Sequence, residues 1–168
     1  LFAERVQTLT DMSELRTNLG GLRRTEKDII INFKNPVEVS ALRESWSKTL
    51  ASQRKRLADV RQVQSGDAEF VASIDKSLDE IKQYETGISP IFEKIEGAQL
   101  DGAGGGAYAD RLKVHMEATD KLFSSLASSA RTQMDEARAG VESRTSTMSA
   151  LIGIGLVLGL AVLIPLTF

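Results

Sequence analysis

Residues 15–33 read LRTNLGGLRRTEKDIIINF, and their apolar residues recur in steps of three and four when one polar position, Glu26, is counted with them. The apolar members of this stripe are Leu15, Leu19, Leu22, Ile29 and Phe33. Such spacing places residues on one face of an α-helix, so it predicts a long amphipathic helix. We expect the helix to end near Asn35-Pro36, because proline disfavours helical geometry in the residue before it and is accepted at the start of the next helix.

Two more stripes of the same kind follow. The second helix is expected to begin at once and to end at Ser65-Gly66, with Gln53 as its one polar intrusion. Its apolar residues are Val39, Leu42, Trp46, Leu50, Leu57 and Val60. The third helix is expected from an N-cap at Asp67, with a local bend at Pro90. Its stripe consists of Phe70, Ile74, Leu78, Ile81, Ile88, Phe92 and Ile95.

A glycine-rich stretch, LDGAGGGA at residues 100–107, interrupts the periodicity. Because glycine costs up to about 1 kcal/mol per helical position relative to alanine, we expect a flexible loop here. It is not expected to bind phosphate, since no strand precedes it and no Gly-Lys-Ser/Thr follows. A fourth helix is predicted from Tyr108 to about Arg144, and nothing in the sequence stops it before the apolar tail.

The tail is the most apolar part of the chain. No charged residue follows Arg144, and residues 150–168 read ALIGIGLVLGLAVLIPLTF. This length is close to the roughly 20 apolar residues that span a bilayer. The sequence therefore predicts two parts, a bundle domain at residues 1–147 and a transmembrane helix at residues 148–168.

Helix length and connection length together predict the topology. Helices of roughly 30 residues rise about 45 Å each, and short connections make neighbouring helices antiparallel. We therefore predict an all-α fold, an antiparallel up-down-up-down four-helix bundle whose fourth helix continues into the transmembrane helix. In a bundle of four antiparallel helices, the first helix begins at the end where the fourth helix leaves. The first helix should therefore start beside the membrane surface that the fourth helix enters, and a further transmembrane helix is expected before Leu1.

Composition excludes several classes of function. The 168 residues include 21 Lys and Arg against 23 Asp and Glu, a formal net charge of -2, so the charge gives no reason to expect a nucleic acid partner. With no cysteine and a single histidine, no metal site is expected. No nucleophile-base pair or cofactor fingerprint appears, so we expect neither an enzyme nor a bound cofactor.

Polar residues interrupt the stripes near the end of the bundle that lies away from the predicted membrane. Glu26 is about eight residues from the end of its helix, hence roughly 12 Å deep, and His115 is about equally deep on the fourth helix. Such groups satisfy one another, face water, or line a pocket for a polar ligand. The candidate ligand-binding residues are Arg23, Arg24, Tyr84, Tyr108, Arg111 and His115. In the ligand interpretation, the planar fork of arginine binds a carboxylate; in the alternative, the arginines belong to a salt-bridged surface.

The element Leu22-Arg23-Arg24-Thr25-Glu26-Lys27-Asp28 resembles the LRRxEKD element in the first helix of methyl-accepting chemotaxis protein sensor domains. The layout, from a long first helix to an uncharged final segment, is similar as well. The resemblance implies a periplasmic sensor between two helices of the inner membrane, dimerised through helix one. The expected assembly is a homodimer or a higher homo-oligomer. The resemblance also implies a HAMP module and a signalling coiled coil in the cytoplasm.

Ligands of that family are amino acids, C4-dicarboxylates, citrate or aromatic acids, bound near the far end between helices one and four. By this resemblance Arg23 is the carboxylate-binding arginine. The family's aspartate receptors use further arginines one and two turns later, where this chain has Asp28 and Asn32, which argues against an amino-acid ligand. We therefore expect a small organic acid, with a di- or tricarboxylate such as malate or citrate ahead of an aromatic acid.

The expected mechanism is a population shift in which the ligand favours one packing of the helices and helix four carries that bias through the bilayer. Two alternatives stay open. One is the input domain of a histidine kinase or other membrane signalling protein, such as a cyclic-nucleotide enzyme. The other is a tail-anchored structural helical protein with no ligand.

Overall fold

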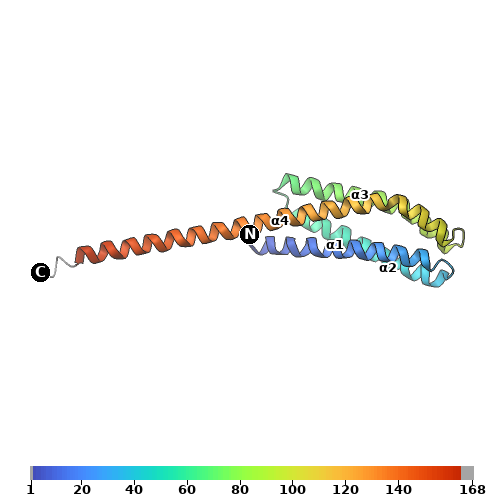
Figure 1. The fold of residues 1–168 in the computed structure, drawn as a ribbon, viewed down its shortest axis with the longest axis horizontal. Helices are drawn as coiled ribbons and strands as arrows, with labels where there is room; N and C mark the ends of the chain where they lie inside the picture. The colour runs from blue at the N-terminus through green and yellow to red at the C-terminus, as the bar shows by residue number, and fades with distance from the viewer. Residues whose placement is uncertain (1, 164–168) are drawn as a thin grey trace.

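Four long helices account for nearly all of the chain (Figure 1). The structure, a computed structural model, describes the backbone of residues 2–163 and the side chains of residues 3–141. The helices are α1 (Phe2–Ile31), α2 (Pro36–Val63), α3 (Ala68–Glu96) and α4 (Gly102–Leu163), and the described backbone contains no strand. Each helix runs antiparallel to the next, so the predicted all-α four-helix bundle is confirmed.

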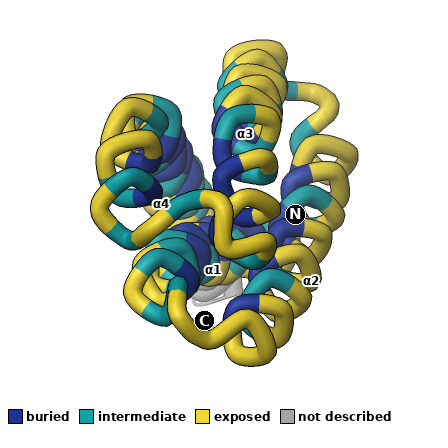
Figure 2. Tube along the Cα trace, turned by 90° about the vertical axis from the view of Figure 1, so that its right-hand side faces the viewer, coloured by how far each residue is buried: buried dark blue, intermediate teal, exposed yellow. Residues whose placement is uncertain are grey.

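The helices form a ring in the order α1, α2, α3, α4 when viewed end-on (Figure 2). Their buried positions face the middle of the bundle. α4 packs extensively on both α3 and α1, whereas the seam between α2 and α3 is the thinnest of the four. Ion pairs cross this thin seam: Arg43–Glu96, Arg54–Glu85 and Arg61–Asp75.

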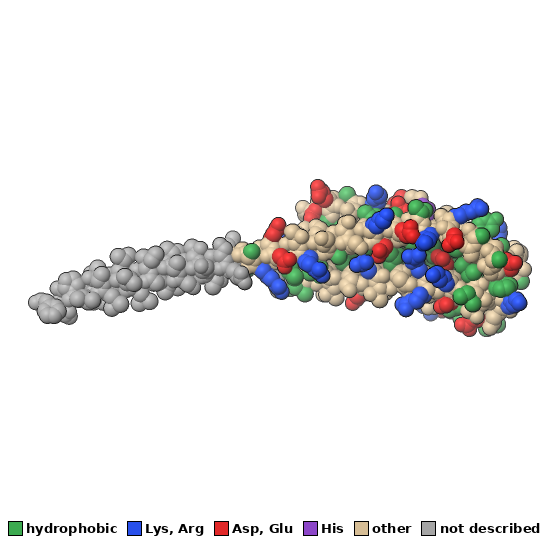
Figure 3. Space-filling model, viewed as in Figure 1, with side chains coloured by type: hydrophobic (Ala, Val, Ile, Leu, Met, Phe, Trp, Pro, Cys, Tyr) green, Lys and Arg blue, Asp and Glu red, His purple; other side chains and the backbone are tan. Residues whose placement is uncertain are grey.

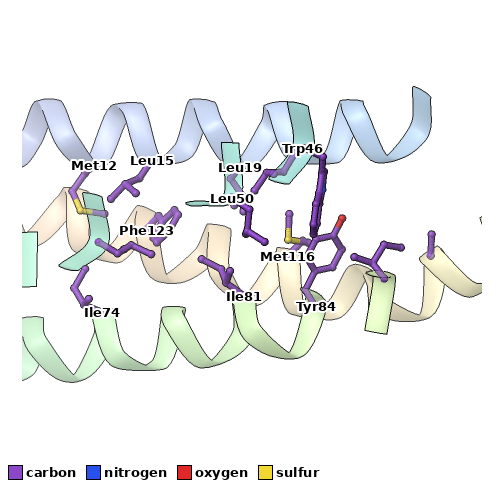
Figure 4. Packing of buried hydrophobic residues seen from close by; sticks show 14 of the residues in the cluster. Met12, Leu15, Leu19, Trp46, Leu50, Ile74, Ile81, Tyr84, Met116 and Phe123 are labelled. Carbon is purple, nitrogen blue, oxygen red and sulfur yellow. The ribbon is translucent and has the colours of Figure 1, made fainter. Parts of the chain in front are cut away.

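The core consists of the predicted apolar stripes together with residues that the stripes omitted (Figure 4). Leu15, Leu19 and Leu22 of α1 are buried against residues of the other helices, as expected. Gln53, the polar intrusion of α2, is buried as well, and its Nε2 donates to the backbone carbonyl of Leu15 over 2.8 Å. α4 contributes Ala109, Met116, Thr119, Phe123, Leu126 and Ala130.

Side-chain caps begin α2 and α3. The Asn35 side chain accepts from the backbone N–H of Glu38, and Pro36 occupies the first turn of α2. α1 ends at Ile31, slightly before the Asn35-Pro36 position expected, because residues 32–34 form the turn. Asp67 caps α3 as predicted, its Oδ1 lying 3.0 Å from the backbone nitrogen of Phe70.

The prediction of a flexible loop over residues 100–107 is wrong, because α4 already begins at Gly102. Two physical causes outweigh the low helix propensity of glycine. The Asp101 side chain accepts from the N–H of Gly104 over 2.7 Å and caps the helix. The glycines also allow close packing, since a Cβ atom on Gly105 would lie 2.8 Å from Cδ1 of the buried Ile95.

α3 ends in a Schellman motif that carries alanine where glycine is usual. The N–H of Gln99 donates to the carbonyl of Lys94 over 2.7 Å, and the N–H of Ala98 donates to that of Ile95 over 3.0 Å. Ala98 has a φ of 55°, in the left-handed region that disfavours a side chain. The turn between α3 and α4 is therefore held under local strain.

α4 runs without interruption from Gly102 to Leu163 and extends well past the end of the bundle (Figure 1). Among the residues that the structure describes in full, no helix has the length and apolar character needed to cross a membrane. The segment predicted to cross it, residues 148–168, lies outside the residues whose side chains the structure describes.

Candidate functional site

The six candidate residues lie in several separate places rather than in one pocket. Tyr84 is in the core, where it meets Glu26, and Tyr108 lies with Arg111 on the surface of α4. His115 pairs with Glu80 at the boundary of α3 and α4. Arg23 is half-buried and Arg24 is exposed, both on α1.

The contact between Tyr84 and Glu26 is the most buried polar contact among the candidate residues. Tyr84 is 1% exposed, and its hydroxyl donates to Oε2 of Glu26. The sequence left three possibilities for the polar residues in this part of the bundle: hydrogen bonds to one another, contact with water, or a ligand pocket. Tyr84 and Glu26 form a hydrogen bond with each other. The contact joins α1 to α3, the diagonal pair of helices that otherwise touch little.

Burial raises the pKa of the Glu26 carboxyl above its usual range. The hydrogen bond from Tyr84 acts in the opposite direction, and so do the positive charges of Arg23 and Lys27. The negative charge of Asp110 on α4 adds to the rise. Burial, followed by the neighbouring carboxylate, also raises the pKa of Tyr84, so this hydroxyl keeps its proton and remains a donor.

The ring of Trp46 packs beside that of Tyr84 in the core (Figure 4). The ring centroid of Trp46 lies 6.0 Å from that of Tyr84 and 5.2 Å, edge-on, from that of Phe92. The indole N–H of Trp46 is buried and makes no hydrogen bond within the described residues. This layer is well packed and leaves the Trp46 donor unsatisfied.

Arg23 lies on the side of α1 that faces α4. Seven residues earlier, Nε of Arg16 lies 3.4 Å from Oδ1 of Asp120 on α4. Seven residues later, Ile30 packs beside Gly105, which is also on α4. Because seven residues are about two helical turns, Arg23 shares this face, and within the described part of the chain neither Arg23 nor Arg24 forms an ion pair with an acid.

His115 belongs to a shallow charged region between α3 and α4. Its Nδ1 lies 2.7 Å from Oε2 of Glu80, and both side chains are mostly buried. A hollow of about 410 Å³ beside them is lined by Asp79, Lys82, Gln83, Thr86, Gly87 and His115. Among the described residues no group of three metal-binding side chains comes together.

Tyr108 and Arg111 face outward near the start of α4. Tyr108 is 50% exposed, and Cζ of Arg111 lies 5.5 Å from the centroid of its ring, a cation–π arrangement. Tyr108 lines a hollow of about 350 Å³ together with Pro90, Ile91, Lys94, Gln99 and Leu100. This is a surface site at the junction of α3, the following turn and α4.

A second hollow, of about 580 Å³, lies at the same end of the bundle and was missed by sequence reasoning. It is lined by Phe33, Lys34, Pro36, Ala98, Gln99, Leu100 and Asp101. Nζ of Lys34 lies 5.6 Å from the centroid of the Phe33 ring. The signal in the sequence was an aromatic-basic pair directly before the helix-breaking Asn35-Pro36, which places both side chains in an exposed turn.

Comparison with known protein families, with curated proteins and with solved structures finds no match for this chain. The residues and their geometry therefore carry the functional argument.

Proposed function

We propose that this chain is the sensor domain of a bacterial transmembrane chemoreceptor, with its bundle in the periplasm and the end of α4 in the inner membrane. The observation that carries the proposal is the uninterrupted course of α4 out of the bundle into a sequence with no charged residue after Arg144. The start of α1 lies at the end of the bundle from which α4 departs (Figure 1), where a preceding membrane helix would enter. Residues 148–168 are the proposed transmembrane helix.

The proposed ligand is a small organic acid, a di- or tricarboxylate such as malate or citrate. Arg23 is the proposed carboxylate-binding residue and Arg24 its neighbour. In support, neither arginine forms an ion pair with an acid within the described residues, and Arg23 is half-buried on the face toward α4. A guanidinium binds a carboxylate through two parallel hydrogen bonds, which gives direction as well as charge.

The proposed active form is a homodimer joined through α1. Exposed positions on this helix recur in steps of four and three along its whole length, which is the spacing of a coiled-coil seam. They are Val6, Thr10, Ser13, Thr17, Gly20, Arg24, Lys27 and Ile31. Several of them are small and uncharged, and a Cβ atom on Gly20 would meet no other side chain or helix within 4 Å among the described residues, so another helix has room to approach closely.

In this proposal the signal is a population shift. The ligand binds one packing of the helices better than the other, and α4 carries the difference along its axis. A continuous helix suits this task because it moves as one element. Cytoplasmic signalling parts beyond Phe168 would receive the displacement and direct chemotaxis.

Calorimetric titration tests the ligand proposal. The full chain in detergent micelles is titrated with malate, citrate, succinate and an amino acid. We expect one of the di- or tricarboxylates to bind, and Arg23→Ala to weaken it at least about tenfold, because a charged hydrogen-bond pair is lost. Arg131→Ala, an exposed arginine elsewhere on α4, is the matched control and should leave affinity unchanged. Absence of binding by every acid would favour the structural, ligand-free alternative.

Disulfide trapping tests the dimer. The chain contains no cysteine, so Thr17→Cys introduces a single thiol on the exposed seam of α1. We expect rapid oxidation to a covalent dimer, whereas Ser52→Cys on the outer face of α2 should remain monomeric. Equal cross-linking at both positions would indicate random collision and contradict a dimer through α1.

A further inference from the structure

Polar contacts join the helices at the end of the bundle from which α4 leaves. The start of α1 and the turn between α2 and α3 lie at this end (Figure 1), and charged side chains of both signs are exposed there (Figure 3). Nε2 of Gln133 on α4 donates to Oδ2 of Asp67 over 2.8 Å. Arg5 on α1 donates to the backbone carbonyl of Gln133. Gln133 is therefore tied to α1 through its backbone and to the α2–α3 turn through its side chain.

The carboxylate of Asp67 serves two helices at once. Its Oδ1 lies 3.0 Å from the backbone nitrogen of Phe70 and caps α3, whereas its Oδ2 accepts from Gln133. A hydrogen bond to a carboxylate is stronger than one between neutral groups, and its strength falls steeply with distance and angle. The turn itself is tied to α1, because Nε2 of Gln64 donates to Oγ1 of the buried Thr8 over 2.9 Å. Asp67 is thus a fixed point against which the position of α4 is set.

Beyond Ala130, apolar packing contributes little to the position of α4. Ala130 is 1% exposed, but none of the residues from 131 to 141 is buried. A hollow of about 320 Å³ lies beside Gln133 and is bordered by the start of α1, the end of α2 and the turn after it. Apolar contact has no preferred direction, whereas hydrogen bonds do. The polar contacts of Gln133 therefore hold this stretch of α4 in place.

We propose that Arg5, Asp67 and Gln133 form a latch that fixes α4 along its axis, so that α4 shifts only when the latch opens. A shift of about 1–2 Å, typical of helices in switching proteins, would stretch the contact between Gln133 and Asp67 beyond the length of a hydrogen bond. The latch therefore has two discrete states, closed and open. Its part in signalling rests on the proposed function, whereas its effect on the position of α4 does not.

Substitutions at the two ends of the side-chain contact open and close the latch. Gln133→Glu sets one carboxylate against another, so we expect it to open the latch. Asp67→Asn, added to Gln133→Glu, restores a hydrogen bond, because the new amide donates to the new carboxylate. Asp67→Ser alone keeps a favoured N-cap residue for α3 but removes the acceptor for Gln133, so it should open the latch as well.

The distance between two spin labels reports the position of α4. The labels are attached at Ser129→Cys on α4 and at Ser47→Cys on α2, both of which are exposed positions. Trp46 lies level with Met116 in the core (Figure 4), so the two labels are separated along the bundle axis. Measurements use the full chain in detergent micelles, diluted with unlabelled chain so that only distances within one chain contribute.

We expect Gln133→Glu and Asp67→Ser each to shift the mean distance by about 1–2 Å. The double variant Gln133→Glu with Asp67→Asn should return to the native distance, which also excludes misfolding as the cause of the shift. Gln62→Glu places the same charge at an exposed position near the end of α2. It is the matched control and should leave the distance unchanged.

The inference is overturned if either Gln133→Glu or Asp67→Ser leaves the distance unchanged, or if Asp67→Asn does not reverse the effect of Gln133→Glu. No ligand is added in these measurements, so the latch and the acid site are tested separately. Binding of malate or citrate together with unchanged distances would overturn the latch alone. Distances that shift and return as expected, in a chain that binds no acid, would uphold the latch and refute the acid site.

Discussion

Replacement of Tyr84 by phenylalanine isolates the hydrogen bond that joins α1 to α3 in the core. The substitution Tyr84→Phe keeps the ring in its packing against Trp46 and removes only the donor to Glu26. A hydrogen bond to a charged group contributes about 1.5–3 kcal/mol, so we expect the free energy of unfolding to fall by about 2 kcal/mol at neutral pH. For a chain of this size that corresponds to a fall in Tm of about 4–8 °C.

The pH dependence of this cost follows from the raised pKa of Glu26. The pKa of this carboxyl is higher in the folded state than in the unfolded state, where it is near 4.5. The resulting contribution to stability is fully present at pH values below the unfolded-state pKa. It is lost as the pH rises through the folded-state pKa. Relative to Glu26→Gln, the native chain should therefore lose stability as pH rises above 4.5. The cost of Tyr84→Phe should be smaller at low pH, where Glu26 is neutral in the fold.

Urea unfolding of the full chain in detergent, followed by the fluorescence of Trp46, the only tryptophan, measures these quantities. The double variant Tyr84→Phe with Glu26→Gln completes a cycle. We expect the cost of losing the hydroxyl to be at least halved in the Glu26→Gln background, because the charge is gone. A cost below about 0.5 kcal/mol for Tyr84→Phe at neutral pH, or one equal in both backgrounds, would refute the reasoning.

Three further predictions concern stability and use the same unfolding assay. Gly106→Ala should stabilise α4 by about 0.5–1 kcal/mol, because a Cβ atom there meets nothing within 4 Å among the described residues. Gly105→Leu should destabilise the fold by about 1–3 kcal/mol, because the larger side chain overpacks against Ile95. Equal effects of the two substitutions would contradict close packing at Gly105. Ala98→Gly should stabilise by about 1 kcal/mol by relieving the positive φ, and a loss of stability would argue against a left-handed residue there. Phe123→Ala, at a fully buried position, should cost about 3–5 kcal/mol, and a cost below about 1 kcal/mol would place this ring outside the core.

The helices of the bundle were predictable because their apolar residues follow a single period. The stripes from Leu15 to Ile29 and from Val39 to Val60 are buried in the positions expected, apart from the half-buried Leu42. The polar interruption at Glu26 was also visible in the sequence. Its partner was not predicted: steps of three and four from Ile81 to Ile88 place Tyr84 on the buried face of α3, but such spacing does not tell which polar atom the Glu26 carboxyl meets.

The glycine-rich start of α4 was not predictable from local propensity. Glycine disfavours a helix in isolation, but Gly105 packs against Ile95 and Asp101 caps the first turn, so tertiary contacts outweigh propensity there. The candidate site was also only partly predictable from the sequence. Tyr84 and Tyr108 were both candidate ligand-binding residues, but Tyr84 lies in the core while Tyr108 lies on the surface.

A chemoreceptor requires α4 to leave the bundle and to enter a bilayer. Single spin labels at Leu158→Cys and, for reference, at Ser128→Cys, measured in the full chain in lipid vesicles, report access to oxygen and to a water-soluble nickel complex. We expect the label at 158 to be accessible to oxygen and shielded from nickel, and the label at 128 to show the reverse. Nickel access at 158 equal to that at 128 would place this part of the chain in water and contradict the receptor.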